Sequence, residues 1–241
     1  MKNILITGIS RGLGLVIAKA LLKLNYSIFG INRTNSDELN EIITEYPNNI
    51  KIFNYDLSDS AGAKNLLTGA FLPIDTPLHG FINNAAIAYD DIITNIQIEP
   101  LENMFRVNVF TPFILTKYVI RNMLFHKTAG SIIHISSISA HTGYKGLGMY
   151  GSTKGALEVF SKTTAREWGS KFIRSNCIVA GFMDTSMSSK LSPDQKDRIY
   201  KRTSLQIPTK MESVAETTVF LLSDKSESIT GQNIFVDSGT I

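Results

Sequence analysis

Cysteine is almost absent from this 241-residue chain, which contains only Cys177. A single cysteine forms no disulfide within the chain, and its apolar neighbours predict a buried strand residue. Long apolar runs are also missing, since no stretch approaches the roughly 18 residues of a membrane-spanning helix. The first apolar run ends at Thr7-Gly8, which is too short for a signal peptide. These absences predict a protein of the reducing cytoplasm that does not insert into membranes.

Charge of one sign is not concentrated anywhere in the sequence. The 24 Lys and Arg residues exceed the 21 Asp and Glu residues by only three, and they are scattered along the chain. Because a nucleic-acid-binding protein presents a clustered basic stripe, no nucleic-acid partner is predicted. No metal site is predicted either, because the histidines do not fall at metal-ligand spacings. They are His79, His126, His134 and His141.

The order of apolar and amphipathic segments indicates the fold class. Short apolar runs alternate with helical patterns about every 20 to 30 residues. This alternation predicts an α/β protein with a doubly wound parallel sheet of about seven strands and helices on both faces. No break in composition divides the chain, so residues 1–241 are predicted to form a single domain.

The individual elements follow from the same pattern. The predicted strands are Asn3–Thr7, Tyr26–Ile31, Asn49–Tyr55, His79–Asn83, Ser131–Ile135, Ile173–Val179 and Asn233–Val236. The main predicted helices are Leu13–Leu24, Asp59–Phe71, Pro100–His126, a helix carrying Tyr150 that ends near Gly169, and Glu212–Leu222. Residues 182–210 interrupt the alternation. This insertion predicts a lid over a ligand crevice.

Three glycines lie between the first predicted strand and the first predicted helix. They are Gly8, Gly12 and Gly14 of the run TGISRGLG. Glycine permits a tight turn and lets a pyrophosphate approach the backbone, while the helix N-terminus offers unpaired N–H groups. The spacing differs from the commoner GxGxxG, and an ordinary strand-to-helix turn is the alternative. The context favours a dinucleotide-binding site.

The residues after the second predicted strand indicate which dinucleotide binds. An acidic residue there would bind a ribose 2′-hydroxyl and repel a 2′-phosphate. No carboxylate appears before Asp37, whereas Arg33 and Arg11 are placed to meet a phosphate. Solvated surface arginines are the alternative explanation. The pattern favours NADP(H) over NAD(H).

Residues 131–154 bring Ser137, Tyr150 and Lys154 into one neighbourhood. Tyr150 and Lys154 are four residues apart, so in a helix they share a face and the ammonium can sit beside the phenol. A nearby cation stabilises a phenolate and lowers the tyrosine pKa from its usual value of about 10. Such a tyrosine can exchange a proton with an alcohol or a carbonyl. From the spacing alone, a surface lysine over a packed tyrosine remains the alternative.

Seven segments resemble the short-chain dehydrogenase/reductase family, in that family's order and over nearly the whole chain. They are TGISRGLG at 7–14, YDLSD at 55–59, NNAA at 83–86, Asn108 within MFRVNVF, ISS at 135–137, YGSTK at 150–154 and ITGQNIFVDSG at 229–239. The resemblance implies a Rossmann-like fold. Three departures leave every reacting group in place, namely Ala86 for a usual Gly, Ala180 for a usual Pro, and Ser238 for a common Gly.

The resemblance also implies catalytic roles. Tyr150 would be the general acid/base, and Ser137 would bind the substrate oxygen. Lys154 would bind the nicotinamide ribose and lower the tyrosine pKa. Asn108 would hold a water in a proton relay to Lys154, although a satisfied polar residue on a helix would look the same.

Cofactor contacts are implied in the same way. Asp56 would meet the adenine, Asn83 would anchor the central strand beside the cofactor, and Thr185 would bind the carboxamide. Considered separately, Asp56 also suits a turn and Thr185 a helix cap. The other implied cofactor-binding residues are Gly8, Ser10, Arg11, Gly12, Leu13, Gly14, Arg33, Leu57, Ala85, Tyr150, Lys154 and Gly181.

The activity implied by the resemblance is NADPH-dependent reduction of a ketone to a secondary alcohol. Similarity to 3-oxoacyl-acyl-carrier-protein reductases suggests an acyl-carrier-borne substrate, and Lys127, Lys171 and Arg174 are candidate contacts to an acidic carrier. Reduction of a sugar, a polyol precursor or another small ketone is the alternative. His141 and Tyr144 are candidate residues of the substrate pocket.

Two further predictions concern an alternative, non-catalytic function and the oligomeric state. A non-catalytic NADP(H)-sensing regulator would be free to lose Tyr150 or Lys154, yet both are present. The helix after Tyr150 carries apolar residues at helical spacing, which predicts core packing. The resemblance implies that part of this surface forms a subunit interface, so a homotetramer or homodimer is expected.

Overall fold

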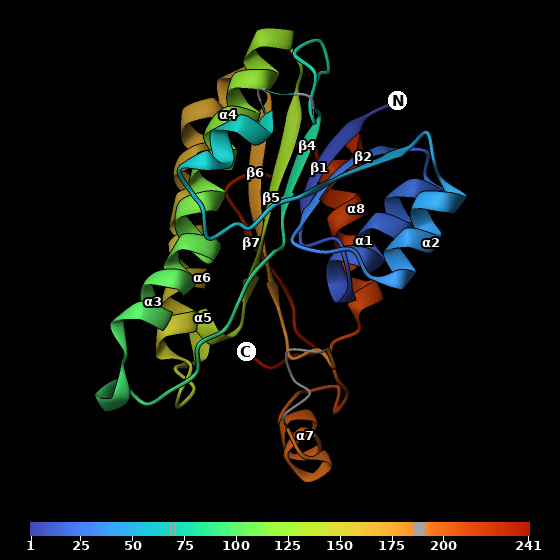
Figure 1. Ribbon diagram of the computed structural model, residues 1–241. Coiled ribbons are helices and arrows are strands. Elements are labelled where there is room, and N and C mark those ends of the chain that lie inside the picture. The colour runs from blue at the N-terminus through green and yellow to red at the C-terminus, as the bar shows by residue number, and fades with distance from the viewer. Residues whose placement is uncertain (68, 70, 186–190) are drawn as a thin grey trace.

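The computed structural model describes residues 1–67, 69, 71–185 and 191–241, and its strands form one parallel sheet (Figure 1). The strand order is β3-β2-β1-β4-β5-β6-β7. Their bounds are β1 Asn3–Thr7, β2 Ser27–Asn32, β3 Ile50–Asn54, β4 Gly80–Asn83, β5 Gly130–Ser137, β6 Ile173–Ala180 and β7 Asn233–Val236. The prediction of a doubly wound parallel sheet of about seven strands is confirmed.

Helices cover both faces of the sheet. Figure 1 shows α1, α2 and α8 on one side and α3, α4, α5 and α6 on the other, while α7 extends beyond the carboxyl ends of the strands. The α-helices are α1 Gly12–Lys23, α2 Asp37–Glu45, α3 Ile98–Phe105, α4 Thr111–His126, α5 Ser139–Thr142, α6 Gly148–Trp168, α7 Pro193–Tyr200 and α8 Met211–Leu222. Short 3-10 segments are η1 Gly62–Leu67, η2 Ile93–Asn95, η4 Gly169–Lys171 and η6 Asp224–Ser226.

Two helix predictions differ from the structure. The helix predicted over Asp59–Phe71 is wrong, because the described residues form only the short η1. The Asp59 side chain accepts the Gly62 N–H at 2.9 Å, as a helix N-cap does, but the turn that follows is 3-10 in geometry and spans only Gly62–Leu67. The pattern predicted to start at Pro100 instead starts at Ile98, and a π-turn, η3 Arg106–Phe110, separates α3 from α4.

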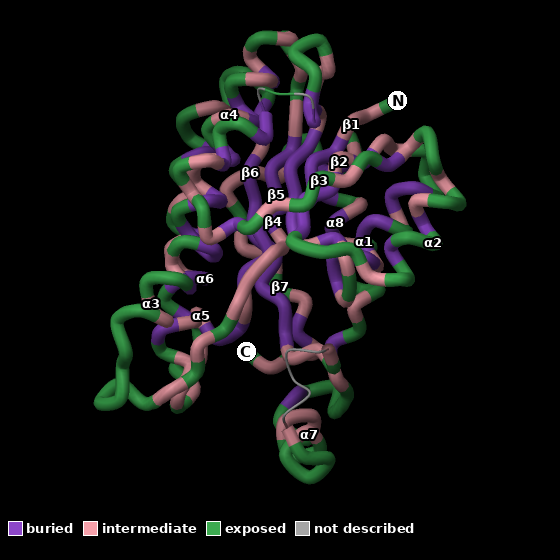
Figure 2. The backbone as a smooth tube through the Cα atoms, in the orientation of Figure 1, coloured by how far each residue is buried: buried purple, intermediate pink, exposed green. Residues whose placement is uncertain are grey.

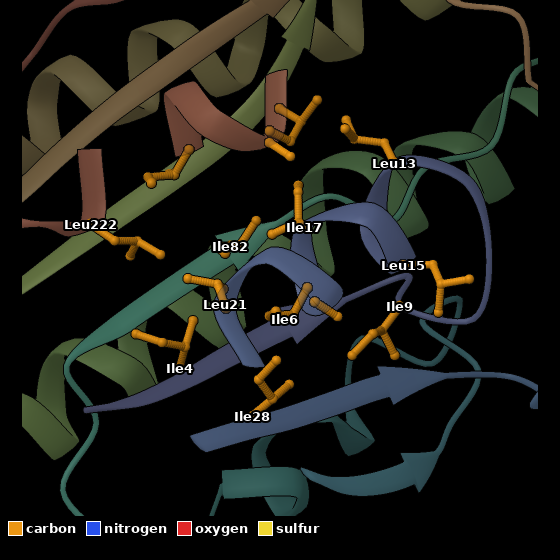
Figure 3. Close-up of a cluster of buried hydrophobic side chains, with 14 of the residues drawn as sticks. Ile4, Ile6, Ile9, Leu13, Leu15, Ile17, Leu21, Ile28, Ile82 and Leu222 are labelled. Atoms are coloured by element: carbon orange, nitrogen blue, oxygen red, sulfur yellow. The ribbon is translucent and has the colours of Figure 1, made fainter. Parts of the chain in front are cut away.

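Burial of the sheet on both faces explains the continuous apolar runs (Figure 2). Alternate residues of β1 enter different cores. Ile4 and Ile6 pack against Ile17 and Leu21 of α1, as Figure 3 shows, whereas Leu5 faces the cluster on the α4 side. Each fully buried side chain of this kind contributes about 1.5–3 kcal/mol.

The order of strands reverses between β1 and β4. The chain runs outward from β1 to β2 and β3, and then returns to place β4 on the other side of β1. Crevices outside the carboxyl ends of parallel strands form at such a switch point. The ends of β1, β4 and β5, at Thr7, Asn83 and Ser137, therefore open onto one space.

A buried histidine in β5 makes the stability of the fold sensitive to acid. His134 lies between Phe81 and Phe160, and its Nε2 has no hydrogen-bond partner among the described residues. Burial, with a smaller effect of the Lys154 charge, lowers its pKa from 6.5 to about 3. Between pH 6.5 and pH 3, His134 is therefore protonated in the unfolded chain and neutral in the folded chain. The free energy of unfolding falls as the pH drops from 6.5 towards 3.

Replacing His134 with phenylalanine should remove this acid sensitivity. Relative to the variant, the wild type should lose on the order of 4 kcal/mol of unfolding free energy between those two pH values. Urea titrations at pH 8, where the imidazole is neutral in both states, provide the reference. Parallel pH curves for the two proteins would contradict the prediction.

Candidate active site

A cavity of about 780 Å³ opens at the carboxyl ends of the strands. Most of the residues predicted from the sequence line it. They are Gly8, Ser10, Arg11, Gly12, Leu13, Gly14, Arg33, Asp56, Leu57, Ala85, Ser137, Tyr150, Lys154, Gly181 and Thr185. Two predicted residues, Asn83 and Asn108, lie behind the wall. The volume falls in the range of small-molecule and cofactor sites.

The glycine-rich turn forms one end of this cavity. Gly8 and Gly12 have φ of 72° and 56°, a left-handed conformation that favours glycine. Gly14 allows the turn to pack, because a Cβ there would lie 2.1 Å from the Gly8 carbonyl oxygen. A Cβ on Gly12 would meet no described atom within 4 Å and would project into open space.

Helix α1 begins at Gly12 with its first N–H groups uncapped by any described side chain. Helix α2 differs, because the Ser36 side chain accepts the Leu39 N–H at 3.1 Å. The Ser36 hydroxyl also donates to the Ser10 carbonyl, which ties α2 to the glycine-rich turn. Uncapped N–H groups and the positive end of the helix dipole at the cavity wall suit a phosphate.

Asn84, which the sequence reasoning missed, anchors this turn. Its Nδ2 donates to the carbonyl oxygens of Thr7 and Gly8, each at 3.1 Å, and it lines the cavity. Asn83 instead contacts Thr7 and His134, with its Nδ2 3.3 Å from His134 Nδ1. The alternation of side chains along an extended strand separates the two neighbours, and the adjacent NN pair was the only available signal.

The end of the cavity near β2 carries both signs of charge. Arg33 and Asp56 line it, and Asp37 does not. The Asp56 carboxylate accepts the Ser58 N–H at 2.9 Å. This hydrogen bond, together with a weaker effect of the Arg33 charge, lowers the pKa of Asp56. Arg33 and the ionised Asp56 are therefore both available to a ligand at this end of the cavity.

Tyr150 and Lys154 project from the first turns of α6, and Ser137 ends β5. The Ser137 hydroxyl oxygen accepts the Ser139 N–H at 3.2 Å, which leaves its own proton available to a ligand. Lys154 Nζ donates to the Ile135 carbonyl oxygen at 2.8 Å and lies 5.6 Å from the centroid of the Tyr150 ring. The three groups thus face one reaction space.

The protonation states differ from the expectation that Lys154 lowers the pKa of the tyrosine. Burial raises the pKa of Tyr150 well above its usual range, and the charge of Asp90 raises it further. Burial also lowers the pKa of Lys154 to about 8. Removal from water disfavours the charged form of both groups, the phenolate and the ammonium. At neutral pH the phenol therefore carries its proton, as a proton donor requires.

Asn108 sits at the centre of the π-turn η3 and is almost fully buried. Its carboxamide exchanges two hydrogen bonds with the Ile87 backbone, each at 2.9 Å, and donates to Thr153 Oγ1 at 3.1 Å. These contacts fix the segment that follows β4 against α6. The widened turn marks a break in the regular helical hydrogen bonding, a feature frequent at functional sites.

The remaining lining shows which pocket predictions hold. Tyr144 lines the cavity as predicted, but the prediction for His141 is wrong, because its ring bonds to Glu158 behind the wall. Apolar residues from several segments, which no local motif marks, form much of the remaining wall. They are Ile87, Val107, Leu147, Phe182, Met183, Leu191 and Ile199.

Comparisons with known proteins agree with this geometry. Residues 8–240 match a family profile described as Enoyl-(Acyl carrier protein) reductase. Carbonyl reductase (NADPH) 2 of Sus scrofa is 32% identical over 237 residues, with 98% of this chain and 94% of the relative covered. The 3-oxoacyl-(acyl-carrier-protein) reductase FabG of Chlamydia pneumoniae is 30% identical over 240 residues, with 99% and 96% covered.

A solved structure, ElxO with NADP bound, has a TM-score of 0.89 to this chain at 26% identity, with 99% of this chain and 98% of that chain covered. Fold and site together define a Rossmann-fold oxidoreductase that uses a nicotinamide dinucleotide. The chain belongs to the short-chain dehydrogenase/reductase family.

The residues present fit such a dinucleotide. The space in front of Gly12, the uncapped start of α1 and the Arg33 guanidinium offer successive contacts along the cavity. Lys154 and Thr185 line the same cavity, where they would hold the nicotinamide end. The bound cofactor would supply the hydride, and the protein would supply orientation and the proton donor.

Alanine substitutions at two glycines should separate binding from folding. Gly12→Ala should weaken NADPH binding by at least about tenfold, because its methyl group enters the phosphate space. The melting temperature should fall only modestly, because the only cost to the fold is the strain of an alanine at a positive φ. Gly14→Ala should unfold the protein, since its methyl group meets the Gly8 carbonyl. Fluorescence titration and thermal melting provide the measurements, and unchanged NADPH affinity in folded Gly12→Ala would contradict the assignment.

Proposed function

We propose that this protein is an NADPH-dependent carbonyl reductase that converts a ketone to a secondary alcohol. The observation that carries the proposal is the meeting of Ser137, Tyr150 and Lys154 in one cavity with the glycine-rich turn. Proton-donating groups and a dinucleotide cradle within one space are what hydride transfer to a carbonyl requires.

Each reacting side chain has a distinct task in this proposal. The Ser137 hydroxyl donates a hydrogen bond to the carbonyl oxygen, and Tyr150 delivers its proton to that oxygen as negative charge develops. Lys154 contributes a positive charge and a contact to the nicotinamide ribose. Asn108 Oδ1 accepts one hydrogen bond, from the Ile87 N–H, and so retains an acceptor position for the relay water that reprotonates Lys154 and Tyr150.

The preferred substrate is a 3-oxoacyl group borne by an acyl carrier. The apolar part of the cavity wall, which includes Leu147, Phe182 and Leu191, suits an acyl chain. Lys145 and Arg202 line the same cavity and are exposed, so they offer cationic contacts to an acidic carrier near the opening.

The carrier contacts predicted from the sequence lie away from the cavity. Lys127 and Lys171 precede β5 and β6, whereas the cavity lies at the other ends of these strands, about 23 Å away for an eight-residue strand. Arg174 is engaged within the fold, since its guanidinium donates to the carbonyl oxygens of Leu221, Ser223 and Ile229.

Turnover of NADPH against a ketone panel tests the proposal. The panel contains 3-oxoacyl thioesters, diketones and keto-sugars, and loss of NADPH absorbance reports reduction. Fastest turnover of the thioesters would support the preferred substrate, whereas fastest turnover of a keto-sugar or a small diketone would assign the alternative. Tight NADPH binding without turnover of any ketone would overturn catalysis and favour an NADP(H)-sensing regulator.

The segment at 182–210 is proposed as the substrate lid of a single domain spanning 1–241. Phe182, Thr185 and Ile199 of this segment line the cavity, while residues 186–190 lie outside the described residues. An ion pair at 2.6 Å links Lys196 of α7 to Asp184. The lid would bring apolar surface over the bound ketone.

Among the described residues, no helix combines the length and apolarity needed to span a membrane. We place the enzyme in the cytoplasm, where a reducing environment keeps thiols such as Cys177 free and supports reduction by NADPH. Cys177 is fully buried in β6, as predicted.

A homodimer or homotetramer is the proposed assembly. Phe110 and Val159, on the helical layer formed by η3, α4 and α6, are 51% and 67% exposed, and Phe113 stacks on Phe160 beside them at 3.7 Å. Burial of such apolar surface stabilises association. Sedimentation should show a dimer or tetramer, and Val159→Glu should shift it towards the monomer. A monomeric wild type would refute the assembly.

A further inference from the structure

Glu158 is a buried carboxylate of α6 that the proposed reaction does not use. It is 6% exposed, and its carboxylate accepts hydrogen bonds from Ser136 Oγ at 2.5 Å and Asn233 Nδ2 at 2.6 Å. His141 Nε2 lies 3.0 Å away, and because a carboxylate only accepts, this nitrogen donates. One side chain thus joins β5, α5, α6 and β7.

Packing alone does not explain this residue. A buried carboxylate costs more free energy than an apolar side chain of similar size, even with its donors in place. Leu157, the preceding residue of α6, is a buried apolar side chain of the ordinary kind. A charged group at Glu158 instead sets the direction of three donors, and directional bonds position the segments that carry them.

Two of the three donors flank the serine of the active site. Ser136 precedes Ser137 directly, and His141 lies at the end of the turn that follows. The Ser137 hydroxyl accepts the N–H of Ser139 within this turn, so its orientation depends on where the turn lies. The turn also sits close against α6, because a Cβ on Gly151 would lie 2.5 Å from the Ser139 carbonyl oxygen.

We propose that Glu158 and His141 form a positioning pair that holds the 136–142 segment so that the Ser137 hydroxyl faces the substrate carbonyl. The inference rests on the proposed function, because it assumes that Ser137 acts on the ketone. Neither residue of the pair touches the cavity space in which the reaction occurs. Both act through the backbone on either side of Ser137.

Substitutions that keep the packing but remove the bonds test the pair. Glu158→Leu should lower kcat on the order of 10- to 100-fold, because a small displacement of a reacting group slows the chemical step. The KM for NADPH should change by less than about twofold, since the dinucleotide contacts lie elsewhere. His141→Phe keeps the ring contact with Phe235, whose centroid is 5.0 Å away, and should lower kcat in the same direction.

Glu167→Gln is the matched control, because Glu167 is an exposed glutamate of the same helix, and it should retain wild-type kcat. The double variant Glu158→Leu/His141→Phe should fall little further than Glu158→Leu alone, because both substitutions break one network. Additive losses of kcat in the double variant would show that the two residues do not act together.

Deuterium uptake in Glu158→Leu should rise in the peptide covering 136–142 and stay unchanged in the peptides of β1 and α1.

Two outcomes separate this inference from the proposed function. If the wild type reduces ketones and folded Glu158→Leu does so equally fast, the positioning pair is wrong while the reductase stands. If the wild type reduces no ketone, the proposed reductase activity is wrong. The deuterium-uptake experiment alone then tests the positioning pair. Uniformly faster exchange across the sheet in Glu158→Leu would show a general structural role and overturn positioning.

Discussion

Tyr150→Phe should lower kcat by about 10²- to 10⁴-fold while NADPH affinity stays within about twofold of the wild type. The substitution keeps the ring in the cavity wall and removes the hydroxyl that carries the proton. Because burial and the Asp90 charge raise the pKa of Tyr150, the wild-type phenol is protonated at neutral pH and available as a donor. Steady-state kinetics with saturating NADPH measures the loss.

Tyr144→Phe provides the matched control, because Tyr144 is a second tyrosine close to the same reaction space. Its hydroxyl has no part in the proposed proton transfer, so kcat should change by only a few fold. Equal losses in the two variants would indicate a general effect on the cavity. Near-normal kcat in Tyr150→Phe would contradict the proposed chemistry outright.

Arg33→Asp should reverse the preference for NADPH over NADH. A guanidinium hydrogen bond to a phosphate contributes roughly 1.5–3 kcal/mol, and a carboxylate in its place adds repulsion from the nearby Asp56 and from the 2′-phosphate. The ratio of kcat/KM for NADPH to that for NADH should therefore fall by about 100-fold or more. Parallel assays with the two cofactors measure this ratio.

Arg166→Asp controls for the change in net charge, because Arg166 is exposed in the last turn of α6 and does not line the cavity. Its cofactor ratio should equal that of the wild type. Arg11→Gln should reduce the ratio less than Arg33→Asp does, since Arg11 lies at the start of α1. An unchanged ratio in Arg33→Asp would show that Arg33 does not recognise the 2′-phosphate.

Local sequence patterns correctly predicted the elements that form through interactions between residues close in sequence. The apolar run of β1, the glycines after it and the helical pattern of α1 appear in the structure within a few residues of their predicted limits. Each depends on backbone preferences and on burial of a continuous strand, which a short window of sequence reports. The failed helix over Asp59–Phe71 shows the limit, because the described residues form only the 3-10 turn η1 although Asp59 makes an N-cap contact to Gly62.

Which side chains face the cavity was harder to predict. Asn83 and Asn84 are neighbours of the same type, and the direction of the chain beyond β4 determines that only Asn84 reaches the cavity. His141 follows the serine of the site closely in sequence, yet its ring is hydrogen-bonded to Glu158 of the following helix and does not line the cavity. These contacts join residues on separate elements, and no local pattern contains them.

The sequence by itself determined the class of chemistry, because the glycine-rich turn and the Tyr150 to Lys154 spacing each operate within a few residues of backbone. Only the tertiary structure decided the protonation states of the site residues and the side from which a carrier can reach the cavity. Burial sets the protonation of Tyr150 and Lys154, and burial arises from segments far apart in the chain. The direction of the strands likewise separates Lys127 from the cavity, since a parallel sheet places the two ends of each strand on opposite sides of the molecule.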